Sequence, residues 1–198
     1  KSIHTSRVAI LGLGTEGVGI AQMLLHFGVG DIVLVDRNGI LSPQRGKMSA
    51  EKTFLAERTN RERRSGGVLE AVVGADVLVS TVPSYIPYEE YVRMMSQQPV
   101  VCITNSLPED VSPEQLCAVG ANVVMQGKVG LPNCVHEDIV LPSLLRGVLE
   151  HDLKHVDTTL KVRVARALAD AVVSPTQNKV IPTIFDKRSR SRIVHACS

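Results

Sequence analysis

The chain has 198 residues, of which 44% are hydrophobic and 21% charged, and this balance is typical of one globular domain with a sizeable core. A net charge of only +2 gives no electrostatic reason to expect nucleic-acid binding. The 3% aromatic content and the lack of Trp argue against a stacking platform for single-stranded nucleic acid.

The first structured stretch is an apolar run, Val8 to Leu11, that ends in a glycine-rich turn and continues at helical spacing. Gly12 would permit the turn, Gly14 would let backbone approach a ligand, and Gly17 would let the helix lie close to the strand. The amides at the helix start then face an anion, which favours the pyrophosphate of a dinucleotide. The predicted cofactor contacts at this turn are Gly12, Gly14, Thr15, Glu16, Gly17 and Val18, with the Glu16 carboxylate turned outward. The alternative is that the glycines only turn the chain.

A second strand, Asp31 to Val35, ends in Asp36, which stands where a carboxylate binds the adenosine ribose in such folds. The adjacent Arg37 could stack on the adenine or meet a 2′-phosphate. We therefore expect NAD as the cofactor, with NADP possible. The alternative is that Asp36 only caps the loop that follows it.

The remaining chain up to residue 126 alternates predicted helices and strands after a long loop over residues 37–46. Helices are predicted at 47–60, 68–73, 88–96 and from Ser112, and strands at 75–80, 100–104 and 122–126. This alternation predicts an α/β fold, a Rossmann-like, doubly wound parallel sheet with right-handed crossovers.

Two loops at carboxyl ends of these strands are further candidates for ligand contacts, because ligands of open α/β sheets bind there. The loop after the strand at 75–80 would line the nicotinamide pocket through Thr81, Val82, Pro83 and Ser84. Asn105, after the next strand, would hydrogen-bond substrate or the nicotinamide ribose, or else form an Asx turn before Pro108.

The pattern changes after Val135, where helices are predicted at 138–149, 156–173 and 187–196, with an extended segment at 179–185. His136, Glu137 and Asp138 do not form a convincing metal site, since adjacent residues do not share one face of a helix. An acidic first helical turn explains the two carboxylates. We expect no metal site among these residues.

The sequence also bears on location. No apolar run is long enough to span a membrane, and the first residues do not form a secretory signal. The four cysteines have no close C-x-x-C pairing, so reduced thiols and a cytoplasmic location are expected. The lack of an initiating Met suggests that the chain begins partway through a longer polypeptide.

Several ordered motifs at matching intervals resemble the carboxyl-terminal nucleotide-binding domain of malic enzymes, with the bacterial short form most similar in spacing. They are Gly-Leu-Gly-Thr-Glu-Gly-x-Gly-Ile-Ala from Gly12, Leu-Leu-x-x-Gly-Val-x-Asp-Ile-x-Leu-x-Asp-Arg-x-Gly ending at Gly39, Gly-Ala-Asp-Val from Gly74, Asn-x-x-Pro-Glu from Asn105, Gly-Lys-x-x-x-Pro-Asn from Gly127, Leu-Pro-x-x-x-Arg-Gly from Leu141, and Ile-Pro-x-x-Phe-Asp from Ile181. The resemblance covers essentially all of residues 1–198, so the whole chain is expected to be one NAD(P)-binding domain whose catalytic domain lies upstream.

The resemblance implies oxidative decarboxylation of malate to pyruvate and CO₂, with hydride transfer to NAD(P) and a divalent Mn or Mg ion polarising the substrate. In the family, the base, the acid and the metal ligands precede the glycine turn, so no catalytic residue is expected in this chain and the chain alone is expected to be inactive. The family implies a homo-oligomer.

The sequence departs from the family pattern at several positions, among them Lys128, Val129 and Gly130 in place of the usual arginine-serine-aspartate. His136 and Glu137 stand where a pair of asparagines holds a malate carboxylate, so Glu137 is a substrate-binding position of altered chemistry. This departure leaves two alternatives open: a malolactic-type enzyme, and a non-catalytic nucleotide-binding module with a degenerate substrate site.

Overall fold

The computed structural model describes residues 1–82, 86–109 and 111–198, which form two compact units, Lys1–Met125 and Gln126–Ser198. In the described residues, no helix is both long and apolar enough to cross a bilayer.

The first unit is built on a six-stranded sheet with the order β3-β2-β1-β4-β5-β6. Its strands are β1 (Arg7–Leu11), β2 (Asp31–Asp36), β3 (Gly39–Ile40), β4 (Val77–Ser80), β5 (Val100–Ile103) and β6 (Val123–Gln126). The pairs β1–β2, β1–β4 and β4–β5 are parallel, whereas β3 runs antiparallel to β2. The predicted Rossmann-like α/β sheet is confirmed, and the chain reverses direction across it between β1 and β4.

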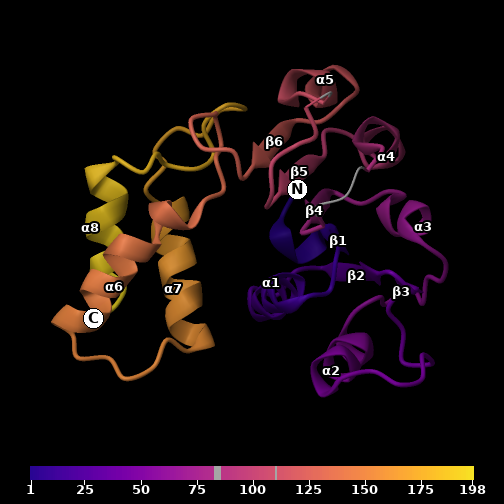
Figure 1. The fold of residues 1–198 in the computed structure, drawn as a ribbon, viewed down its shortest axis with the longest axis horizontal. Helices are drawn as coiled ribbons and strands as arrows, with labels where there is room; N and C mark the ends of the chain where they lie inside the picture. The colour runs from indigo at the N-terminus through magenta and orange to yellow at the C-terminus, as the bar shows by residue number, and fades with distance from the viewer. Residues whose placement is uncertain (83–85, 110) are drawn as a thin grey trace. The chain divides into compact units, whose positions relative to one another are not determined.

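Helices cover both faces of this sheet (Figure 1). They are α1 (Thr15–His26), α2 (Ala50–Arg58), α3 (Val68–Val72), α4 (Tyr88–Met94) and α5 (Pro113–Ala118), whereas η1 (Ile3–Thr5) precedes β1 and buries no residue. Successive strand residues point to opposite faces. In β1, Ile10 packs into a core with residues of α1 and α2, while Ala9 and Leu11 pack into a second core with residues of α3, α4 and α5. The alternation of apolar side chains therefore fixes a three-layer unit.

The predicted loop over residues 37–46 contains the short strand β3, which the sequence did not reveal. Gly39 has a φ of +92°, a conformation that favours glycine. The Ile40 amide also donates to the Gly66 carbonyl at 2.9 Å, which ties this edge of the sheet to the connection before α3.

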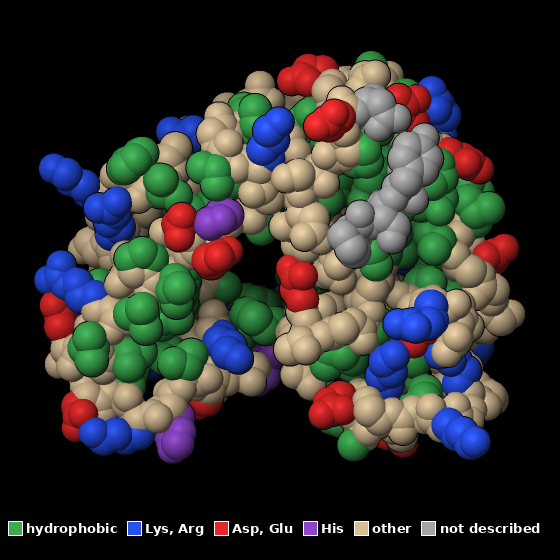
Figure 2. Space-filling view, viewed as in Figure 1, with side chains coloured by type: hydrophobic (Ala, Val, Ile, Leu, Met, Phe, Trp, Pro, Cys, Tyr) green, Lys and Arg blue, Asp and Glu red, His purple; other side chains and the backbone are tan. Residues whose placement is uncertain are grey.

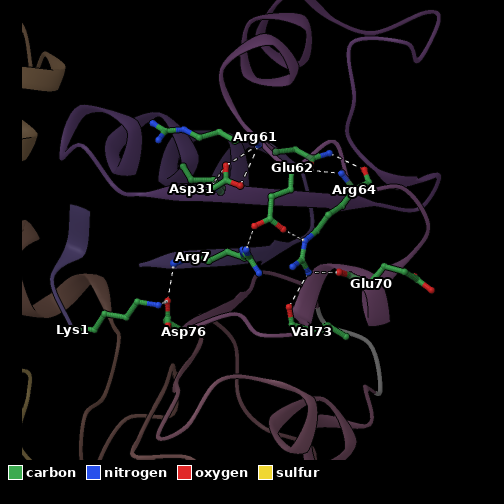
Figure 3. A network of polar contacts seen from close by, with 11 residues as sticks. Lys1, Arg7, Asp31, Arg61, Glu62, Arg64, Glu70, Val73 and Asp76 are labelled. Carbon is green, nitrogen blue, oxygen red and sulfur yellow. Dashed lines mark hydrogen bonds and ion pairs between the residues drawn. The ribbon is translucent and has the colours of Figure 1, made fainter. Parts of the chain in front are cut away.

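A polar network joins the amino-terminal ends of β1 and β2 to the connection between α2 and α3 (Figure 3). Arg7 and Arg64 both pair with the Glu62 carboxylate, with Arg64 Nε at 3.0 Å. Arg64 Nη1 also donates to the carbonyls of Glu70 and Val73, at 2.9 and 2.8 Å. A cation near the carboxyl end of α3 stabilises the carbonyls left unpaired there.

Asp76 lies just before β4 and accepts hydrogen bonds at the same end of the sheet. Its carboxylate accepts from the Arg7 amide at 2.9 Å, Lys1 Nζ at 2.7 Å and the Ser96 hydroxyl at 2.8 Å. These contacts lie at the end of the sheet opposite to the glycine turn, so they support the fold and leave the carboxyl ends of the strands accessible.

The second unit is a small helical body. It contains η2 (Glu137–Ile139), α6 (Leu141–Glu150), α7 (Thr158–Ala169) and α8 (Lys187–His195). Leu160 and Val164 of α7 pack with Ile193 of α8 and with Cys197 in one buried cluster. Hydrophobic side chains also gather on the surface over α6 and the helices beside it, where Leu145 and Leu149 are exposed (Figure 2).

Three expectations for this unit need adjustment. The helix predicted at 138–149 is split into η2 and α6, because Pro142 lacks an amide proton and fits only the first turn of a helix. α7 is shorter than the predicted 156–173, since Asp157 caps it at 2.8 Å from the Leu160 amide and its last residue is Ala169. The segment 179–185 forms no strand.

Candidate nucleotide-binding site

A hollow of about 750 Å³ lies where β1, β2 and β4 end. These are the strands on either side of the point where the chain reverses its direction across the sheet, the usual ligand position in an open α/β sheet. The residues that line it are Leu11, Gly12, Leu13, Gly14, Thr15, Glu16, Val35, Asp36, Arg37, Asn38, Lys52, Val68, Thr81, Val82, Ile86 and Tyr91. The structure thus brings together eight predicted site residues: Gly12, Gly14, Thr15, Glu16, Asp36, Arg37, Thr81 and Val82.

The glycine turn leaves backbone exposed to this hollow. Gly12 has a φ of +96°, and a Cβ there would lie 2.5 Å from Thr81 Oγ1. A Cβ on Gly17 would lie 1.9 Å from the Gly12 carbonyl oxygen, so α1 can approach β1 this closely only with glycine at that position. A Cβ on Gly14 would meet nothing within 4 Å, and Gly14 is the N-cap of α1 with no side-chain cap. The amides of the first turn of α1 are therefore available to an anion.

Glu16 introduces a negative charge at this same turn. Its side chain is exposed and lines the hollow. Burial raises the pKa of the Cys102 thiol to about 12, and the negative charge of Glu16 contributes to that increase. Cys102 therefore stays a neutral thiol beneath the turn at physiological pH.

Thr81 joins the two strands that flank the hollow. Its amide donates to the Leu11 carbonyl at 2.9 Å. Its hydroxyl lies 3.1 Å from the Leu11 carbonyl and 3.2 Å from the Gly12 carbonyl. The side chain is thus engaged with the backbone of the glycine turn, and Val82 beside it lines the hollow.

Asp36 is surrounded by hydrogen-bond donors at the other end of the hollow. Arg45 Nη2 lies 2.9 and 3.1 Å from its two oxygens, and Lys52 Nζ lies 2.7 Å from Oδ2. The Asn38 amide donates to Oδ1 at 2.9 Å. Burial alone would raise the pKa of this carboxyl, but the hydrogen bonds from Lys52, Asn38 and Arg45 outweigh it, and the pKa is lowered. Asp36 is therefore an ionised carboxylate with both oxygens already occupied.

Of the other predicted site residues, those that the structure describes do not line the hollow. Gly17 is buried against the turn, and Val18 packs into the core beneath α1. Asn105 is exposed beyond the carboxyl end of β5. Pro83 and Ser84 lie outside the described residues.

Glu137 belongs to the second unit, where it is exposed in η2. The neighbouring His136 caps this helix, with Nδ1 at 3.3 Å from the Asp138 amide. In the parts of the chain that the structure describes, no three His, Cys, Asp or Glu side chains are grouped so that they could hold a metal ion. The acidic start of η2 is thus capped from within the chain.

Several residues in or beside the hollow were not identified from the sequence. Arg45 and Lys52 reach Asp36 from 9 and 16 residues along the chain, and no short-range pattern marks such a contact. Ile86 and Tyr91 come from the segment around α4 and give the hollow an apolar wall. The sequence indicated them only weakly as ligand contacts, because buried apolar residues are usually explained by core packing.

Known proteins resemble this chain over nearly its whole length, although no family model matches it. It is 31% identical over 99% of its length to a bifunctional malic/malolactic enzyme of Bacillus subtilis, of which it covers 48%. It is 26% identical over 96% of its length to an NADP-dependent malic enzyme of Halomonas elongata, of which it covers 45%.

Solved structures agree with these relatives. The crystal structure of an NAD-dependent malic enzyme from Thermotoga maritima matches the whole chain with a TM-score of 0.90 at 29% identity, and the chain covers 52% of that protein. The chain thus spans about half the length of the relatives it matches. By sequence and by fold, the chain is similar to the carboxyl-terminal NAD(P)-binding domain of short-form bacterial malic enzymes.

Proposed function

We propose that the chain is the cofactor-binding domain of a malic-type oxidoreductase and binds NAD or NADP in the hollow between the ends of β1, β2 and β4. The observation that carries the proposal is the open backbone at Gly14, where a Cβ would meet nothing within 4 Å, next to the uncapped first turn of α1. A diphosphate is the ligand that such a turn favours.

The described residues fit the cofactor along the full length of the hollow. The amides that follow Gly14 would hold the pyrophosphate, the group around Asp36 would hold the adenosine ribose, and Val82, Ile86 and Tyr91 would offer an apolar wall to the nicotinamide end. Bound NAD(P) would supply a hydride acceptor, and the protein would supply position and charge.

We further propose that the adenosine end accepts the 2′-phosphate of NADP as well as the free ribose of NAD. The sequence alone favoured NAD, on the assumption that Asp36 offers an unoccupied carboxylate. In the structure the oxygens of Asp36 accept from Arg45 and Lys52, and Arg37 also lines the hollow. Three cations against one carboxylate give a positive surface that suits a phosphate dianion.

For the longer protein we propose decarboxylation of malate to pyruvate, with Mn or Mg held mainly by residues outside this chain and with a homo-oligomeric, cytoplasmic assembly. This proposal rests on the family and on the free thiols of all four cysteines. Asn105 and Glu137 are the proposed substrate contacts from this half. A malolactic reaction is the second candidate, because one relative is named a malic/malolactic enzyme.

Titration calorimetry of the 198-residue chain with NAD and NADP tests the proposal. In Gly14→Val the new side chain would extend into the open space at the turn, so we expect cofactor binding to fall by at least tenfold while the fold is kept. Gly19→Ala is the matched control, because a Cβ there also meets nothing within 4 Å and Gly19 does not line the hollow. Equal binding by wild type and Gly14→Val would refute the proposal.

A further inference from the structure

A second hollow, of about 670 Å³, lies in the second unit between α6 and α8. It is lined by Pro142, Ser143, Arg146, His151, Lys187, Arg190, Ser191, Val194 and His195. Three of these side chains are cationic, two are imidazoles and two are hydroxyls, and no carboxylate is among them. The hollow therefore offers only hydrogen-bond donors, or groups that can become donors, to a charged ligand.

The arrangement follows from how α8 packs. Its buried face, which includes Ser189 and Ile193, is turned toward the core of the unit. Lys187, Arg190 and Val194 follow at helical spacing on the face beside it and line the hollow. A Cβ on Gly147 of α6 would lie 2.5 Å from Cys197 Sγ, so glycine lets the two helices approach closely and bring their cations to one groove.

The cationic side chains that line the hollow have donor atoms and charge available to bind a ligand. Arg146 uses Nε for Glu150, at 2.7 Å, and this leaves both of its terminal nitrogens. Arg190 donates from Nε and Nη2 to the Ile184 carbonyl, a neutral group, so its charge stays uncompensated. In the part of the chain that the structure describes, Lys187 forms no ion pair.

Ser143 of α6 adds a hydroxyl to the cationic lining. The residue is only 6% exposed, and what it exposes lies at the hollow. A hydroxyl at this place can donate to an anion that enters the hollow.

We propose that the groove between α6 and α8 is a binding site for a small anion that carries two or more phosphate charges. Arginine and lysine side chains that line one groove suit phosphate oxygens, also where one of them, Arg146, pairs with Glu150 outside the lining, and the volume is within the range of small-ligand sites. Pro142 and Val194 would contact the organic part of a phosphate ester. All residues that line it belong to the second unit, whereas those that line the nucleotide hollow belong to the first.

Titration of the 198-residue chain with inorganic pyrophosphate tests this site, with calorimetry for affinity and the six histidine ring resonances for position. We expect saturable binding that shifts the resonances of His151 and His195. The double variant Lys187→Gln/Arg190→Gln should weaken it by at least tenfold. The double variant Arg188→Gln/Arg192→Gln removes the same charge from the same helix but outside the hollow, and it should bind like wild type.

Ser143→Ala provides a milder test in case the double variant unfolds, and a severalfold loss of pyrophosphate affinity is expected. Citrate serves as the carboxylate probe and should bind more weakly than pyrophosphate. Three results would overturn the proposal: no shift of the His151 and His195 resonances, equal losses in the two double variants, or tighter binding of citrate.

Discussion

Lys52 Nζ lies 2.7 Å from Asp36 Oδ2, so the carboxylate that was expected to accept from the cofactor ribose is already paired with a cation of α2. The pair is shielded, since the Asp36 side chain is only 9% exposed. A cation held at this place can contact a phosphate that approaches the ribose, which is why we propose that the domain accepts NADP as well as NAD.

Lys52→Gln is therefore expected to weaken NADP binding more than NAD binding. Loss of one charge-assisted contact to a phosphate corresponds to about a tenfold change in affinity, or about 1.4 kcal/mol. Arg58→Gln is the control, because Arg58 lies on the same helix and outside the hollow. The measurement is calorimetric titration with each cofactor, and a larger loss for NAD than for NADP would contradict the assignment.

Gly17→Ala is expected to destabilise the domain and to reduce cofactor affinity together. The added Cβ would meet the Gly12 carbonyl oxygen at 1.9 Å, and backbone atoms cannot give way as a flexible side chain can. Such overpacking costs roughly 1–3 kcal/mol. Urea denaturation measures the loss, with Gly19→Ala as the helix control, which should be neutral or stabilising. A fully stable Gly17→Ala protein would show that the turn is not as tightly packed as described.

Arg64→Lys is expected to lower the free energy of unfolding by about 1.5–3 kcal/mol, because one ammonium cannot replace a guanidinium that donates to two carbonyls and a carboxylate at once. Arg61→Lys is a close control, since Arg61 contacts Asp31 through its backbone amide (Figure 3). Urea denaturation of both variants at neutral pH makes the comparison. Equal stability of the two would indicate that the network in Figure 3 contributes little.

The stability of the first unit should fall at acid pH in a way that depends on Asp76. Burial raises the pKa of this carboxyl, but contacts with Lys1, the Arg7 amide and Ser96 lower the pKa by more. A carboxyl with a lowered pKa in the folded state contributes stability that is present above the unfolded pKa of about 3.9 and is lost as the pH falls through the folded pKa.

Urea midpoints measured between about pH 7 and about pH 3 check this expectation. Asp76→Asn should be less stable than wild type at neutral pH, and the difference should shrink toward the acid end of the range. Glu57→Gln removes a carboxylate from an exposed ion pair, so the change of the urea midpoint with pH should stay nearly as in wild type. If the urea midpoints of wild type and Asp76→Asn change with pH in parallel, the Asp76 contacts are not the cause of the pH dependence of stability.

The sheet could be predicted from the sequence because its signal is local. The apolar runs before Gly12 and Asp36 bury side chains on both faces, and such runs between turn residues indicate parallel strands. The start of α5 was also predictable, since Ser112 and Gln115 form a capping box around Pro113. β3 was missed, because two residues within a loop of glycines and prolines are too few to show the alternation of apolar and polar side chains that indicates a strand.

The site could be predicted only in part for a related reason. The glycine turn is a contiguous motif, so its residues were found together. The surroundings of Asp36 depend on how the loop at 37–46 and α2 fold back, which places Arg45 and Lys52 against a carboxylate distant in sequence. The hollow between α6 and α8 likewise needs the packing of two helices at Gly147, which helical spacing alone does not describe.

The bonds from Thr81 to the carbonyls of Leu11 and Gly12 have one more consequence. They fasten the floor of the cofactor hollow across two neighbouring strands before any ligand arrives, and Gly17 presses α1 onto the same point. A preformed turn would lose little conformational entropy when the proposed dinucleotide binds, so we expect the cations around Asp36 to set the difference in affinity between the two dinucleotides.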